Sequence, residues 1–125
     1  MMKITNSLIG VVLLASIAWA QTPTVISVDI TKAQLTWSWA QGTGGVVVEF
    51  RIKCGNAAGM YTKTTVLADP AARTLPVASA IGGPGNWFCA VSAANQFGES
   101  PNSNEINFAA GNVPVAPSGL QILVQ

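Results

Sequence analysis

The chain contains no histidine, and only 9% of its 125 residues are charged. Without histidine, Ser-His-Asp and Cys-His catalytic arrangements are excluded, as are zinc sites built on histidine. The sequence also has no Walker-type loop and no dinucleotide-binding fingerprint. Its five carboxylates lie at no motif spacing, and a domain of this size has little room for a substrate cleft around a pair that assembles in space. We therefore expect no enzyme, no cofactor and no metal site.

An excess of charge of one sign is missing as well. The formal net charge is +1, from six basic and five acidic residues. The basic residues after position 20 are scattered along the chain and equal the acidic ones in number. Such a chain lacks the basic surface that attracts nucleic acid or anionic lipid. We expect no nucleic-acid partner, and the length predicts one domain.

The one long apolar run lies at the N-terminus and is too short to span a bilayer comfortably. Lys3 precedes the apolar residues 8–18, and Ala18-Trp19-Ala20 has the form of a signal-peptidase site. These three features in this order are typical of a secretory signal peptide. Residues 1–20 are therefore predicted to direct export and to leave no stable membrane span after cleavage. The alternative is an uncleaved anchor that starts at Ile4.

Beyond residue 20, no segment has a convincing helical period, and 12 glycines and 7 prolines separate short β-prone runs. Alternation of apolar and polar residues is clearest at residues 33–40, 46–54 and 87–94, where every second side chain shares a face. The pattern predicts an all-β fold with seven strands packed as a sandwich over residues 21–110. The predicted strands are residues 24–30, 33–40, 46–54, 61–67, 73–77, 87–94 and 105–109. The inward side chains are predicted to be Leu35, Trp37, Trp39, Val48, Phe50, Ile52, Cys54, Trp87, Cys89, Val91 and Ala93.

Residues 87–100, with the sequence WFCAVSAANQFGES, resemble the sixth strand and the following loop of fibronectin type III domains. Weaker matches support the resemblance: Leu35 to Trp39 looks like the family's second strand, with Trp39 as its core tryptophan, and Phe50 and Ile52 look like its third. The resemblance implies an immunoglobulin-like β-sandwich. The family usually has a tyrosine where this chain has Trp87, so the hydrogen bond made at that corner must differ. A broader immunoglobulin-like sandwich is the alternative.

The resemblance also implies a pairing of Cys54 with Cys89. In the family's topology the third and sixth strands are antiparallel neighbours, which places the end of one beside the start of the other. An exported domain meets oxidising conditions, in which a disulfide persists. The alternative is two free thiols that act as small core residues.

Recognition in such a sandwich is expected from loops at its ends. The resembled topology brings the loops at residues 41–45 and 95–104 to the same end. Phe97 either anchors a partner or packs back onto the domain, and the three tryptophans of the strands form either core or a sugar-stacking platform. The candidate binding residues are Gly42, Thr43, Asn95, Phe97, Glu99 and Asn102.

Residues 111–125 form a proline-containing linker or tail that resembles the start of another repeat. Its alternating Leu120, Ile122 and Val124 predict an extra strand that either opens a further repeat or adds to the sheet edge of another copy. We expect a secreted or periplasmic, non-catalytic adhesion or spacer module that recognises a protein or carbohydrate. The alternative is a structural subunit on a cell surface or virion that self-associates through residues 113–125.

Overall fold

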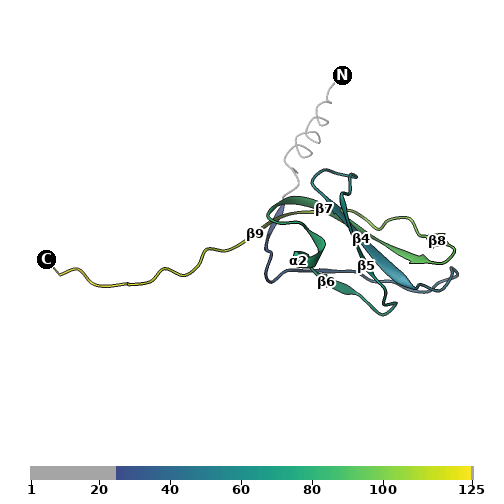
Figure 1. Ribbon diagram of the computed structural model, residues 1–125, viewed down its shortest axis with the longest axis horizontal. Coiled ribbons are helices and arrows are strands. Elements are labelled where there is room, and N and C mark those ends of the chain that lie inside the picture. Colours follow the sequence, from purple (N-terminus) through teal and green to yellow (C-terminus); the bar gives the residue numbers. More distant parts are fainter. Residues whose placement is uncertain (1–24, 125) are drawn as a thin grey trace, which may run out of the picture.

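The computed structural model describes residues 25–124, which form eight strands in two sheets and one short helix. The described part of the chain is all-β apart from this one helix, and its two sheets have a sandwich-like arrangement (Figure 1). The predicted signal peptide lies outside the described residues. The elements are β2 (Ile26–Asp29), β3 (Gln34–Thr36), β4 (Glu49–Gly55), β5 (Lys63–Leu67), β6 (Thr74–Pro76), α2 (Val77–Ala80), β7 (Gly85–Asn95), β8 (Gly98–Glu99) and β9 (Ile106–Gly111).

The larger sheet has the strand order β2-β9-β7-β4-β5, and β8 also pairs with β7. All of its pairs are antiparallel except β2 with β9, which run parallel. The smaller sheet consists of β3 and β6 in antiparallel register. The first strand therefore joins the larger sheet, and β3 has β6 as its one strand partner among the described residues.

The core lies between the two sheets and is built from the alternating side chains of the strands. Phe50, Ile52 and Cys54 of β4 are almost completely buried. Leu35, Trp37 and Trp39 alternate with exposed residues, as predicted, and pack against this core. The other buried members are Val47, Leu75, Val77, Ala80, Ile81, Trp87, Cys89, Phe108 and Ala110.

The predicted count of seven strands is wrong, because the chain turns back directly after β7 and forms β8. Gly98 has φ of +148°, a backbone conformation that other residues rarely adopt. This conformation places residues 98–99 beside the end of β7, where Gly98 pairs with Asn95 and Glu99 with Ala94. The loop after the strand is therefore a tight hairpin with two turn residues.

Three further expectations need correction. The predicted strand at residues 33–40 is assigned as strand only at Gln34–Thr36, although its burial pattern alternates up to Trp39. Val48 is exposed and Val47 is buried, because both precede β4 and the period of two does not extend back through them.

The helix α2 was not predicted. It is one turn, in which Ile81 N–H donates to the Val77 carbonyl, and four residues are too few to show a helical period.

Residues 112–124 form an extended tail that makes no strand pairing within the described part of the chain. Figure 1 shows the tail in yellow as it leaves the domain from β9, at the end opposite to β8. Its apolar side chains are exposed. The predicted extra strand is thus an extended segment here, with no partner among the described residues.

Candidate recognition surface

The hairpin between β7 and β8 presents Phe97 to solvent at its tip. The side chain of Phe97 is 87% exposed, so the alternative in which it packs back onto the domain is wrong. The Phe97 N–H donates to Asn95 Oδ1 at 2.8 Å, which fixes the turn through a side chain two residues upstream. An exposed aromatic ring is costly to keep in water, and the hydrogen-bonded turn limits the backbone freedom that would be lost on binding.

The loop at residues 41–45 lies beside this hairpin, as predicted. The side chain of Asn95 connects the two segments, since its Nδ2 donates to the Val46 carbonyl at 2.9 Å. A Cβ atom on Gly45 would lie only 2.9 Å from Asn95 Nδ2, so a larger residue there would displace the Asn95 amide. Gln41 holds the loop together by donating from Nε2 to the carbonyls of Gly44 and Gly45.

A pocket of about 250 Å³ opens between the two loops. Its lining includes Trp39, Gln41, Gly45, Val46 and Asn95. The Val46 side chain is 70% exposed, which adds a second apolar residue to the surface near Phe97. Gly42 and Thr43 form the exposed turn of the neighbouring loop. Four of the six predicted binding residues are therefore brought to one end of the domain: Gly42, Thr43, Asn95 and Phe97.

Glu99 and Asn102 lie elsewhere, on the face of the larger sheet that points away from the core. Glu99 is opposite Ala94 on β7, which in turn is opposite Glu49 on β4, so these residues share a face. Glu99 forms ion pairs with Arg51 and Lys53. Asn102 Oδ1 accepts a hydrogen bond from Lys53 Nζ at 2.9 Å.

These contacts give Glu99 a structural function. Its carboxylate accepts hydrogen bonds from Lys53 and from the Ser92 hydroxyl, and these lower the pKa of Glu99 from 4.5 to about 2. Arg51, which also contacts Glu49 at 2.7 Å, is held in its charged form, and its pKa is raised. Glu99 thus anchors the Phe97 hairpin to β4 and β7, and its charge is already neutralised by residues of the same chain.

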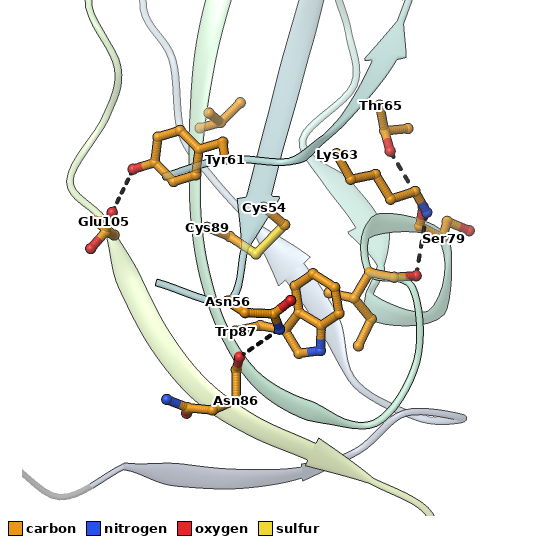
Figure 2. The surroundings of a disulfide bond; sticks show 12 residues. Cys54, Asn56, Tyr61, Lys63, Thr65, Ser79, Asn86, Trp87, Cys89 and Glu105 are labelled. Atoms are coloured by element: carbon orange, nitrogen blue, oxygen red, sulfur yellow. Dashed lines mark hydrogen bonds between the residues drawn. A yellow bond between two sulfur atoms is a disulfide. The ribbon is translucent and has the colours of Figure 1, made fainter. Parts of the chain in front are cut away.

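The disulfide between Cys54 and Cys89 confirms the predicted pairing. The two residues are directly opposite each other on the antiparallel strands β4 and β7, with Cα atoms 4.2 Å apart. Figure 2 shows the bond in the core beside the Trp87 ring. The disulfide lies at the end of β4 away from the Phe97 hairpin, so it covalently fixes the two central strands that carry the recognition end.

At the corner before β7, Trp87 makes a hydrogen bond with its indole N–H, where the resembled family uses a tyrosine hydroxyl. Its indole Nε1–H donates to the Gly83 carbonyl, four residues upstream, at 2.8 Å. Nearby, Asn56 Nδ2 donates to the Asn86 carbonyl at 3.0 Å (Figure 2). Trp87 therefore binds the loop before β7 to that strand, and Asn56 binds the turn after β4 to the start of β7.

The remaining two strand tryptophans also belong to the packed interior. The ring centroids of Trp37 and Trp39 lie 5.6 Å and 6.2 Å from that of Phe50. The Arg73 guanidinium lies 5.9 Å from the Trp39 ring. Both tryptophans are half-buried and pack against Phe50, and Trp39 also lines the pocket between the loops.

The chemistry available at this end is recognition through apolar contacts and loop backbone. Within residues 25–124, no group of three or more His, Cys, Asp or Glu side chains could hold a metal ion. No helix in that range is both long and apolar enough to cross a membrane. Comparison of the chain with protein-family models, with curated proteins and with solved structures finds no match.

Proposed function

We propose that this protein is an exported, non-catalytic recognition module with a fibronectin type III-like sandwich, which binds a protein or a glycan through the end that carries Phe97. The Cys54–Cys89 disulfide supports export, because such bonds persist in oxidising compartments. The strand order β2-β9-β7-β4-β5 facing β3-β6 supports an immunoglobulin-like arrangement. The corner hydrogen bond of Trp87 substitutes for the one that a tyrosine makes in such domains.

The exposure of Phe97 is the single observation that carries this function. Aromatic side chains dominate the energetics of protein interfaces, and they act best when the free protein already holds them in position. The Asn95 side chain bonds both the Phe97 backbone and the neighbouring loop. The ion pairs of Glu99 fix the second strand of the hairpin. Phe97 is therefore presented by a preorganised turn.

Screening the labelled protein against an array of glycans and a panel of extracellular protein domains tests this proposal. Every ligand found is then measured with Phe97→Ala and with Met60→Ala. Met60 is 67% exposed in the turn after β4, at the other end of the sandwich, and serves as the matched control. We expect Phe97→Ala to weaken binding by about 2 kcal/mol or more, roughly 30-fold, and Met60→Ala to leave it unchanged. Unchanged binding by Phe97→Ala for every ligand would exclude this surface.

The exposed tail favours a second candidate function, that of a structural subunit which joins other copies of itself on a cell surface or virion. Four apolar residues near the end of the tail are each at least 81% exposed. Isolated apolar residues are common on protein surfaces, but four within five positions of an extended segment are suited to strand addition. They are Leu120, Ile122, Leu123 and Val124.

A further inference from the structure

The outer edge of β3 in the small sheet has no strand partner among the described residues. Trp37 N–H donates to the Arg73 carbonyl and Val77 N–H donates to the Ala33 carbonyl, so the odd-numbered residues of this segment point their backbone groups at β6. In an antiparallel pair the backbone groups of the intervening residues point to the opposite side. Gln34, Thr36 and Ser38 therefore direct their N–H and C=O groups away from β6. No described residue makes a backbone hydrogen bond with them.

A groove of about 320 Å³ runs along this edge, between residues 35–38 and residues 103–106. Its lining includes Ile52 and Cys89, which otherwise belong to the buried core. Trp37 also lines the groove, and its buried indole N–H has no hydrogen-bond partner among the described residues. The two layers of the sandwich are thus separated here, beside a strand edge with free donors and acceptors.

The tail has the properties of a strand that would fill this groove. Leu120, Ile122 and Val124 alternate with Gln121 and Leu123, so one side of an extended strand would be wholly apolar. Pro114 and Pro117 precede this stretch and favour an extended course away from the domain. An inserted strand would also bring backbone carbonyls beside the unpartnered indole of Trp37.

We propose that residues 119–124 of one copy insert along the free edge of β3 in a second copy. There the tail strand would pair with the backbone of Gln34, Thr36 and Ser38 and direct Leu120, Ile122 and Val124 into the groove. This inference rests on the second candidate function, to which it adds the docking site. The tail and the groove are different surfaces, so the contact is head-to-tail. A copy whose tail is docked still has a free groove, and a copy whose groove is filled still has a free tail. The product is an open chain unless the rotation between copies closes a ring.

The first experiment measures the molar mass of the whole protein by sedimentation over a wide range of concentration. Ile122→Asp places a charge on the side of the tail that enters the groove, whereas Gln121→Asp places the same charge on the side that faces solvent. Both residues are exposed in the single copy, so neither change disturbs the domain. We expect species larger than dimers in the unaltered protein and with Gln121→Asp. With Ile122→Asp we expect the association constant to fall by roughly 30-fold or more.

The second experiment locates the docking site by oxidative cross-linking between two variants. Protein with Gln121→Cys is mixed in turn with Gln34→Cys, Thr36→Cys and Ser38→Cys, three exposed positions on the free edge. Thr64→Cys, which is exposed on β5 at the border of the larger sheet, is the control. We expect a mixed disulfide dimer with at least one β3-edge position and none with Thr64→Cys.

The outcomes separate the docking site from the function on which it rests. A protein that stays monomeric at every concentration contradicts both the self-assembly and its site. Association that survives Ile122→Asp, or that cross-links to Thr64→Cys and to no β3-edge position, contradicts the groove alone and leaves self-assembly in place.

Discussion

At the scale of single residues, Glu99 joins three strands on the outer face of the larger sheet. It belongs to β8, accepts a hydrogen bond from Ser92 of β7 and forms ion pairs with Arg51 and Lys53 of β4. The pKa of Glu99 is lowered to about 2, mainly by the hydrogen bond from Lys53. A carboxyl group with a lowered pKa in the folded state stabilises the fold when ionised.

This pKa predicts how acid weakens the protein. The contribution of Glu99 is fully present above its ordinary pKa of 4.5 and is lost as the pH falls towards 2. We expect Glu99→Gln to lower the free energy of unfolding by about 1 kcal/mol at pH 7, because the ion pairs are partly exposed. At pH 2 the variant and the unaltered protein should have nearly the same stability. Urea denaturation at a series of pH values measures the difference, and a difference that stays constant down to pH 2 would contradict the assignment.

Residue types alone predicted part of the candidate site. The absence of a hydroxyl on Trp87 predicted a different corner bond, and the structure provides it from the indole to Gly83. The loop sequence suggested Phe97 and Glu99 together as binding residues. It could not separate them, because the exposure of Phe97 and the ion pairs of Glu99 depend on the tight turn and on the facing strand.

At the scale of elements, the disulfide joins the two central strands of the larger sheet. Cys54 and Cys89 are 35 positions apart, so the bond closes a loop that contains β5, β6 and α2. The chain-entropy model gives a closure of this length a stabilisation on the order of 3–4 kcal/mol.

We expect the paired change Cys54→Ala with Cys89→Ala to lower the free energy of unfolding by about that amount. Urea denaturation of the variant, of the oxidised protein and of the reduced protein measures it. Before reduction, both cysteines should resist alkylation, and reduction should add the mass of two hydrogen atoms. Alkylation of both thiols in the oxidised, folded protein is the result that would disprove the bond in solution.

The sequence predicted strands better than it predicted their partners. Alternation at β4 identified the inward face, since Phe50, Ile52 and Cys54 are buried. On β7, Trp87 and Cys89 are buried as predicted, but the predicted outward residues at positions 90, 92 and 94 are more buried than Val91 and Ala93. The parallel pairing of β2 with β9 and the free edge of β3 were not predicted, because side-chain periodicity marks a buried face and carries no information about the neighbouring strand. Strand β8 was not predicted for a related reason, because two residues are too few to show an alternation of apolar and polar side chains.

At the scale of the whole molecule, the predicted signal peptide at residues 1–20 can be tested by measuring export and cleavage of the protein. We expect the exported protein to begin at Gln21 and to carry the disulfide, as intact mass and thiol alkylation would show. Leu13→Arg places a charge in the apolar run and should keep the protein inside the cell with reducible thiols. Asn6→Arg adds the same charge before the run and should leave export unchanged. Export of a chain that retains residues 1–20 would show an anchor in place of a signal.

The tail leaves the domain at the end opposite to the Phe97 hairpin, and this separation bears on avidity. In copies joined tail to groove, each hairpin that stays uncovered would display its own contact site. Ligands arranged on a surface would then meet many sites tethered together. A weak individual affinity would be amplified by a high effective concentration, without any additional contact in the single module.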